Sequence, residues 1–188
     1  MSADPLDLTT VANLQAWLRL ANVSTETGVE LQRLVTSTSN WIQSWLSRTI
    51  PDMPYTDTLD GQGGARLSLG NYPVLAVSSV VVDGQTIPAS TGPTMPGWFL
   101  ANDAVVLRTY RFTRDLGNVV ISYTAGFTTV PPDLEQACLE LAAMRWKERE
   151  RIGHSAITMG GQQTNFITSD MPASVKTILN QWKKVVPC

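Results

Sequence analysis

The spacing of apolar residues changes twice along the chain, and these changes constrain the fold more than any other feature of the sequence. Up to about residue 49, apolar side chains recur every three or four positions, which is the helical period. From Tyr55 to Gly126, short β-rich runs are separated by turns that contain glycine and proline. From Pro132 the helical period returns. The sequence therefore predicts an α+β fold, a helical bundle with a β-rich insertion between the second and third helices.

About four helices are expected from the apolar stripes and the capping residues. The first begins near Thr9 or Thr10, because either hydroxyl can cap the free amides of a first turn. The second begins between Ser24 and Thr27, and Glu30 follows Thr27 at the spacing of a capping box. The expected helices span residues 10–21, 26–49, 132–151 and 172–184.

The β-rich insertion is expected to span residues 55–126 and to contain about six short strands. Its clearest hairpin signal is the pair Asp83-Gly84, which follows the β-branched run from Val77 to Val82. The connections are too short for helical crossovers, so the strands should be mainly antiparallel. At 188 residues, the whole chain (1–188) is expected to be one domain.

Few residues in the sequence could carry chemistry. The single histidine, His154, is distant in sequence from Cys138 and Cys188, and Cys138 falls within an apolar helical stripe. Neither a nucleophilic dyad nor a zinc site is therefore expected. The glycine cluster Gly61 to Gly64 precedes a strand and is not followed by Lys-Ser/Thr, so it does not match a phosphate-binding loop. We expect no enzymatic activity, no metal and no cofactor.

Charge and hydropathy indicate protein partners. The formal net charge is −2, which gives no overall basic excess for holding a nucleic acid backbone. Charged residues make up only 16% of the chain, so part of the surface is expected to be covered by partner proteins. No apolar run approaches the roughly 20 residues that span a bilayer, and the first residues do not resemble a secretion signal. A membrane role is therefore not expected.

Several short motifs follow one another in a particular order. They are Leu14-Gln15-Ala16-Trp17-Leu18, Trp41-Ile42-Gln43-Ser44-Trp45, Thr58-Leu59-Asp60-Gly61, Tyr72-Pro73-Val74, Ser122-Tyr123-Thr124-Ala125-Gly126 and Pro132-Asp133-Leu134. From about residue 10 to about residue 184, this series resembles the head–tail connector proteins of long-tailed bacteriophages, which are also called head-completion or adaptor proteins.

The resemblance implies a structural protein of the virion, located at the interface between head and tail. Proteins of this kind form a ring, commonly a dodecamer, that docks under the portal and extends the DNA channel. The ring presents a surface to a stopper or tail protein, and the genomic DNA passes through it without sequence-specific binding. The resemblance implies a helical-bundle fold and brings no metal or nucleophile motif.

Two sets of residues are candidates for the contacts of such a ring. The third helix carries two adjacent apolar stripes, so it is expected to pack on two sides and to form part of the ring interface. The segment from Gly153 to Ser169 follows neither period and is expected to be a mobile loop with a Gly160-Gly161 hinge. The candidate ring interface is Leu139, Ala142, Ala143, Trp146 and Arg149. The candidates for contact with the portal or a neighbour are Gly153, His154, Gly160, Gly161, Phe166, Trp182, Lys183, Lys184 and Val186.

Other functions stay open at this point. The chain could be a different virion part, such as a tail terminator or a stopper. It could also be a stand-alone binding module whose β region holds a ligand through Trp98, Phe99 and Tyr110. Aromatic residues on strands are more often part of a core, which favours the structural role.

Overall fold

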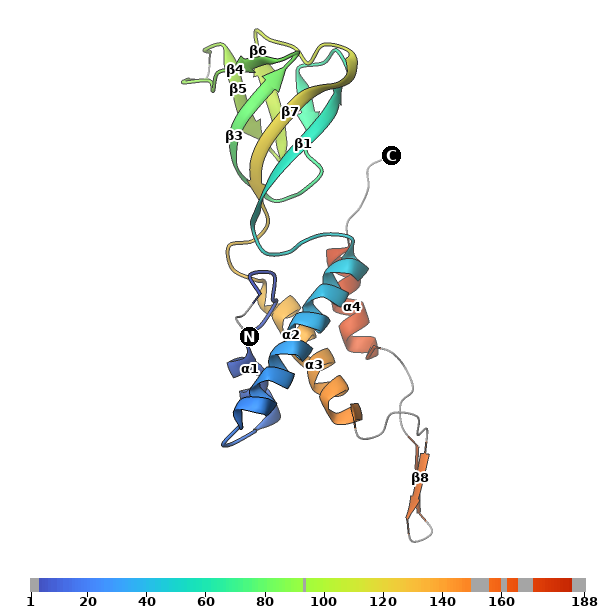
Figure 1. The fold of residues 1–188 in the computed structure, drawn as a ribbon. Coiled ribbons are helices and arrows are strands. Elements are labelled where there is room, and N and C mark those ends of the chain that lie inside the picture. The colour runs from blue at the N-terminus through green and yellow to red at the C-terminus, as the bar shows by residue number, and fades with distance from the viewer. Residues whose placement is uncertain (1–3, 93, 150–155, 160–161, 166–170, 184–188) are drawn as a thin grey trace. The chain divides into compact units, whose positions relative to one another are not determined.

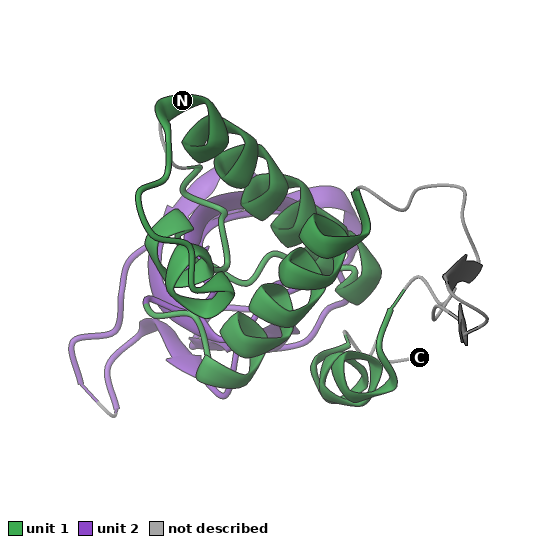
Figure 2. Cartoon of the chain, turned by 90° about the horizontal axis from the view of Figure 1, so that it is seen from below, with its two compact units in different colours: residues 1–51, 129–188 green, residues 52–128 purple. Residues whose placement is uncertain are grey.

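The computed structural model of the chain describes residues 4–92, 94–149, 156–159, 162–165 and 171–183 (Figure 1). The chain forms two compact units, which Figure 2 shows in different colours. Unit 1 comprises Met1–Pro51 and Thr129–Cys188, and unit 2 comprises Asp52–Thr128. The predicted α+β class, with strands inserted between the second and third helices, is confirmed. The sequence predicts one domain. Inside it, the β-rich insertion forms a separate compact unit because it has a hydrophobic core of its own.

Unit 1 contains the four expected helices, each shorter than its predicted range. Ser24 Oγ accepts a hydrogen bond from the Thr27 amide at 3.2 Å, so the second helix is capped by Ser24 and not by Thr27. The same helix ends where Ser47 adopts a left-handed conformation, before Pro51 is reached. The helices are α1 (Val11–Leu18), α2 (Thr25–Leu46), α3 (Pro132–Glu148) and α4 (Ala173–Trp182). None of the helices among the described residues is long and apolar enough to cross a membrane.

The core of unit 1 lies where α3 packs against α1, α2 and α4. Leu14 of α1 and Leu31 of α2 have no exposed surface, and they pack in one cluster with Ala142 of α3. The small side chain of Ala142 lets the helix backbones approach closely. The apolar stripes that predicted the helices therefore meet one another inside a single chain.

Two polar side chains on the buried face of α2 hold the segment that precedes α1 and the segment that follows α2. Ser39 Oγ accepts a hydrogen bond from the Leu8 amide at 2.9 Å. Gln43 donates from Nε2 to the Leu6 carbonyl at 3.0 Å and accepts from the Ile50 amide at 3.1 Å. These bonds satisfy backbone groups that would otherwise be buried without partners.

Unit 2 consists of two antiparallel sheets. The first has the strand order β1-β7-β3-β4 and the second has the order β2-β6-β5. Their inner faces share one core cluster, to which Val80, Val105 and Ile121 contribute with no exposed surface. The strands are β1 (Met53–Gly61), β2 (Arg66–Ser68), β3 (Val74–Val82), β4 (Gln85–Ile87), β5 (Gly97–Ala101), β6 (Ala104–Arg108) and β7 (Asp115–Ala125). The Asp83-Gly84 pair forms the predicted tight hairpin, between β3 and β4.

The segment expected to be a loop contains a hairpin, so that prediction is wrong for part of its length. Strands β8 (Ala156–Met159) and β9 (Gln162–Asn165) pair antiparallel, from Ala156 opposite Asn165 to Met159 opposite Gln162. Only the two residues Gly160-Gly161 separate the strands, and a glycine pair at this spacing is a hairpin-turn signal. The pair was interpreted as a hinge because the flanking residues do not alternate clearly between apolar and polar.

Candidate functional site

Two of the motifs that carry the family resemblance meet inside unit 2. Tyr123 donates a hydrogen bond to Asp57 Oδ2 at 2.5 Å, and Asn71 Nδ2 donates to the Tyr123 hydroxyl at 3.0 Å. The Gly126 amide donates to the carbonyl of Pro73 at 2.9 Å. The residues at Tyr-Pro-Val and Ser-Tyr-Thr-Ala-Gly therefore hold β7 to the segment that precedes β3. These hydrogen bonds position the sheet.

The electrostatics of this network follow from burial. Tyr123 is only 2% exposed, and its ring stacks on Tyr55 with the ring centroids 5.6 Å apart. Burial, followed by the hydrogen bond to Asp57, raises the pKa of Tyr123 to about 12. The hydroxyl stays protonated and keeps donating to the carboxylate throughout the physiological range.

Three of the five candidates for the ring interface are covered within their own chain. Leu139, Ala142 and Ala143 are 8%, 0% and 5% exposed, in the cluster where α3 packs on α1 and α2. Contact with a neighbour through these side chains would require unit 1 to open. The second apolar stripe of α3 is therefore explained by packing inside one copy.

The other two candidates lie at the end of α3, where Arg149 is exposed and Trp146 is partly buried against the same cluster. The Arg149 guanidinium carbon lies 3.6 Å from the centroid of the Trp146 ring. Arg149 Nη1 also lies 3.4 Å from Glu30 Oε2, and both side chains of this ion pair are about half exposed. Exposed pairs of this kind contribute about 0–1 kcal/mol to stability, so little would be lost if a neighbour replaced either contact.

Two candidates for portal contact are tied to their own chain. Trp182 Nε1 donates to Asp133 Oδ2 at 2.7 Å, which joins the end of α4 to the start of α3. Lys183 Nζ lies 5.2 Å from the centroid of the Trp45 ring near the end of α2. The remaining candidates lie outside the described residues: Gly153, His154, Gly160, Gly161, Phe166, Lys184 and Val186.

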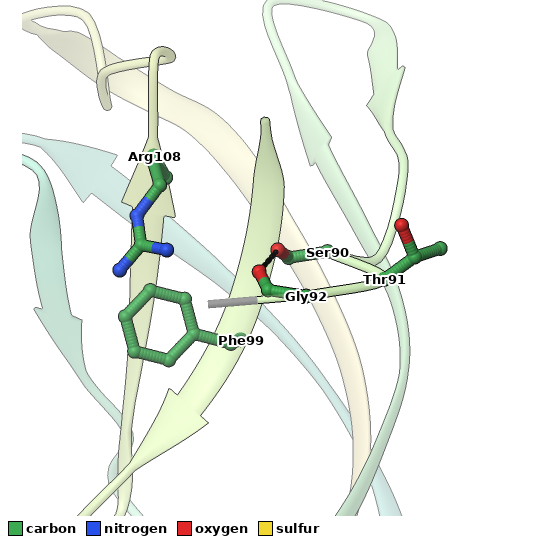
Figure 3. Close-up of a pocket in the computed structure, with 5 residues that line it drawn as sticks. All are labelled: Ser90, Thr91, Gly92, Phe99 and Arg108. Atoms are coloured by element: carbon green, nitrogen blue, oxygen red, sulfur yellow. Dashed lines mark hydrogen bonds between the residues drawn. The ribbon is translucent and has the colours of Figure 1, made fainter. Parts of the chain in front are cut away.

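A pocket of about 410 Å³ lies on unit 2, lined by Ser90, Thr91, Gly92, Phe99 and Arg108 (Figure 3). The Arg108 guanidinium carbon lies 5.1 Å from the centroid of the Phe99 ring. Arg108 Nη1 is buried and has no hydrogen-bond partner among the described residues. The pocket therefore combines an aromatic face with a cationic donor that has no acceptor in the described part of the chain.

The wall of this pocket is held in place by hydrogen bonds. The Trp98 amide donates to the Pro88 carbonyl at 2.9 Å, and the Ser90 amide donates to the Trp98 carbonyl at 2.8 Å. Ser90 Oγ lies 2.8 Å from the Gly92 carbonyl oxygen and donates within the same short loop. The shape of the pocket therefore exists before any ligand arrives.

The structure separates the three aromatic residues that a ligand module would use. Trp98 packs against the core of unit 2, whereas Phe99 lines the pocket and Tyr110 is 38% exposed. Arg108 is not among the site residues predicted from the sequence. The available signal was the alternation along β6, which places Arg108 on the outer face, two residues after Val106 and on the strand next to Phe99.

No group of three or more histidine, cysteine or acidic side chains within the described residues could hold a metal ion. Cys138 is buried, and burial raises the pKa of its thiol to about 12. The thiol therefore stays protonated and packs as a small apolar side chain.

The family of the protein follows from a match to a family profile over most of the chain. The profile of the head completion protein family matches residues 7–185. The chain belongs to the head completion protein family. It is a structural protein of the connection between a phage head and its tail, which is the role and the virion location that the sequence resemblance implied. No individual curated protein matches the chain at a comparable level.

Three solved structures share the fold of this head completion protein, and each match covers 100% of the chain. A chain in the neck of a native gene transfer agent particle, computed with C12 symmetry, has a TM-score of 0.62, 19% identity and 94% coverage of that chain. A chain in the neck of an empty particle, computed with C6 symmetry, has a TM-score of 0.61, 21% identity and 95% coverage. A chain in the virion of the native gene transfer agent has a TM-score of 0.60, 21% identity and 95% coverage.

Proposed function

We propose that this head completion protein forms a ring between the portal and the stopper or tail of a phage particle, and that the ring extends the channel through which the genome passes. The observation that carries the proposal is the match over the whole chain to subunits of particle necks computed with C12 and C6 symmetry. The match includes both the helical unit and the β-rich unit, so both units have counterparts in the solved neck chains.

The distribution of exposed apolar side chains supports a role in assembly. Trp17 of α1 is 49% exposed, Val29 of α2 is 44% exposed, and Leu116 of β7 is 83% exposed. A ring requires a heterologous interface, in which one patch of a copy binds a different patch of the next copy. Large exposed side chains on both units offer surface for such contacts and for contacts with other neck proteins.

The hairpin β8–β9 is the part of unit 1 that we assign to portal contact. Within the described residues, neither strand pairs with a third strand. A two-stranded hairpin is marginally stable alone in water, so a partner that pairs with it or covers it would stabilise it. The neighbouring candidates, from Gly153 to Phe166 and at the C-terminal end, belong to the same proposal.

The charge of the chain suits a channel through which DNA moves. A net charge of −2 provides no strong overall attraction for the phosphate backbone. DNA should pass without a specific site, because tight phosphate contacts would have to be broken at each step along the channel.

The proposal is tested by mixing the purified full-length chain with the portal protein of the same particle and imaging the mixture by electron microscopy. We expect a ring coaxial with the portal. A chain that remains monomeric, with no affinity for the portal, would exclude the proposed role. A ring that binds the tail tube and ignores the portal would instead identify a tail terminator.

One deletion and one control substitution test the assignment of the hairpin. Deleting residues 160–165 removes the turn and β9 and should weaken binding to the portal while leaving the melting of both units unchanged. Replacing Asp83-Gly84 by Asn-Gly changes the hairpin between β3 and β4, keeps the turn type of that hairpin, and should leave portal binding intact. Unchanged portal affinity after the deletion would show that the contact lies elsewhere.

A further inference from the structure

Arg108, which lines the pocket of unit 2, carries a hydrogen-bond donor that no described residue satisfies. Its Nη1 atom is buried and has no acceptor among the described residues. A buried donor without a partner costs about 1–3 kcal/mol, and more when the donor is charged. The Phe99 ring centroid lies 5.1 Å from the guanidinium carbon, and both side chains line the pocket. A carboxylate fits best, because it forms charge-assisted hydrogen bonds with guanidinium and matches its planar geometry.

The register between β1 and β7 shifts at the start of β7, and the three residues Asp115–Gly117 there, which we call the turn, display an apolar side chain beside a carboxylate. Leu116 is 83% exposed, the largest exposure among the large apolar side chains of the described residues. Its amide donates to Asp115 Oδ1 at 2.8 Å, and the Gly117 amide donates to Asp60 Oδ1 at 2.6 Å. These bonds fix the turn, so that docking would require little further ordering.

The pocket and the turn belong to different sides of unit 2. Figure 1 shows the connection from β4 to β5, which forms the pocket wall, projecting from one side of the unit. β1 lies on the other side, and Gly61 at its end pairs with Asp115 at the start of β7. Two different patches on two sides of one copy are what a closed ring requires.

We propose that the turn Asp115–Gly117 of one copy inserts into the Arg108 pocket of the next copy, with the Asp115 carboxylate on the guanidinium and Leu116 against Phe99. The proposal rests on the ring proposed above and names one of its contacts. Met95, which is 53% exposed in the loop that forms the pocket wall, extends the apolar surface available to Leu116.

The charges of unit 2 favour a protein carboxylate over a DNA phosphate as the ligand. The unit has six acidic and four basic residues and is therefore negative overall, which opposes a polyanion. The negative charge of unit 2 repels a single carboxylate on a neighbouring copy far less than it repels the many phosphates of DNA. The acidic residues are Asp52, Asp57, Asp60, Asp83, Asp103 and Asp115, and the basic residues are Arg66, Arg108, Arg111 and Arg114.

Disulfide cross-linking of the full-length chain tests the contact directly. Thr91→Cys in the pocket and Leu116→Cys in the turn are combined in a Cys188→Ser background, in which the remaining cysteine, Cys138, is buried. Oxidation of assembled rings should give a covalent ladder that extends to the full ring, whereas either single variant should give none. The matched control replaces Leu116→Cys by Leu75→Cys, at a side chain of the same unit that is 44% exposed.

Charge reversal provides an independent measurement. Arg108→Glu should raise the concentration needed for half-maximal ring assembly by about tenfold or more, because close charge pairs at interfaces couple by about 1.5 kcal/mol or more. Asp115→Arg alone should also weaken assembly. The double variant should recover to within about threefold of the original chain.

The outcomes separate this inference from the proposed function. Rings that form normally but give no ladder, and that tolerate Arg108→Glu, would overturn the contact and leave the ring intact. Failure of the original chain to form any ring would overturn both. If Arg108→Glu leaves assembly unchanged but reduces DNA retention in the channel, the ligand of the pocket is a phosphate and the proposed contact is wrong.

Discussion

The hydroxyl of Tyr123 lies 2.5 Å from Asp57 Oδ2, on the inner face of the sheet where β7 pairs with β1. Asn71 donates to the same hydroxyl from the segment before β3. One side chain of the Ser-Tyr-Thr-Ala-Gly motif therefore joins three parts of unit 2. The contact gives Tyr123 of this motif a structural role inside unit 2.

Removing this hydroxyl should destabilise unit 2. We expect Tyr123→Phe to lower the free energy of unfolding by about 1.5–3 kcal/mol, the range for a hydrogen bond to a charged group. Urea denaturation followed by tryptophan fluorescence measures the change. Tyr55→Phe is the matched control, because it keeps the ring that stacks on Tyr123 and removes a different hydroxyl. An equal loss in both variants would contradict the assigned role of the contact.

The raised pKa of Tyr123 predicts a loss of stability at alkaline pH. In the unfolded chain this phenol ionises near its ordinary value of 10.0, whereas in the fold its pKa is about 12. The contribution is fully present below pH 10 and is lost as the pH rises from 10 to 12, because only the unfolded state releases its proton in that interval. Comparing the pH dependence of unfolding in Tyr123→Phe and in the original chain isolates this residue. Curves of identical shape above pH 10 would show that its pKa is not raised.

The cap of α2 gives a prediction for unit 1. Ser24→Ala removes the oxygen that accepts from the Thr27 amide, so we expect a loss of about 1 kcal/mol in the stability of unit 1. Ser37→Ala, at an exposed position inside the same helix, is the control and should be neutral or slightly stabilising. If Thr27 were the cap, as its spacing to Glu30 suggests, Thr27→Ala would cost more than Ser24→Ala.

The fold could be predicted from the sequence where one spacing of apolar residues extends over many positions. The stripe through Leu31, Val35 and Ile42 predicted α2, and the Asp83-Gly84 pair predicted its hairpin. The helix ends were less predictable, because the end of α2 depends on the left-handed conformation of Ser47, and Pro51 lies four residues further on. The spacing of apolar residues does not predict a left-handed conformation at a single residue such as Ser47.

The candidate site was much harder to predict from the sequence than the fold. The apolar residues of α3 read equally well as a core or as an interface, since both bury the same kind of side chain. Leu139 and Ala143 belong to the core because α1 and α2 already cover them. The pocket depends on Arg108 meeting Phe99 across two strands, and a register of strand pairs cannot be read from one strand alone.

A close backbone approach at Gly61 predicts a strong effect of a single methyl group. A Cβ at this position would lie 1.8 Å from the Thr113 carbonyl oxygen and 2.8 Å from Asn118 Oδ1. Gly61→Ala should therefore force the turn beside Asp115 to move and should destabilise unit 2 by about 1–3 kcal/mol, the usual cost of overpacking.

The control for this substitution lies three residues further along the chain. At Gly64 the nearest heavy atom to an added Cβ is 3.8 Å away, so Gly64→Ala should be tolerated. Thermal unfolding of both variants, together with the cross-linking yield at Leu116→Cys, measures the fold and the turn separately. Equal stability of the two alanine variants would mean that the backbone at Gly61 is not as close to Thr113 as the structure shows.

The placement of Ala142 predicts how the third helix responds to a larger side chain. Ala142 has no exposed surface and lies between α3 and the helices α1 and α2. Ala142→Leu should lower the stability of unit 1 by about 1–3 kcal/mol through overpacking, and the loss should be the same at all protein concentrations. Ala12→Leu, at an exposed position on α1, is the control and should leave unfolding unchanged.

The concentration dependence of this effect distinguishes the core from a ring interface. If Ala142 belonged to an interface, Ala142→Leu would leave the dilute, monomeric chain as stable as the original and would change only the concentration at which rings assemble. Denaturation of the monomer, followed by light scattering as the concentration rises, separates the two results. A stable monomer with altered assembly would return this face of α3 to the interface of the proposed ring. An unstable monomer would mean that the proposed ring uses other surfaces, for which Trp146, Arg149 and the exposed side chains of unit 2 are the candidates.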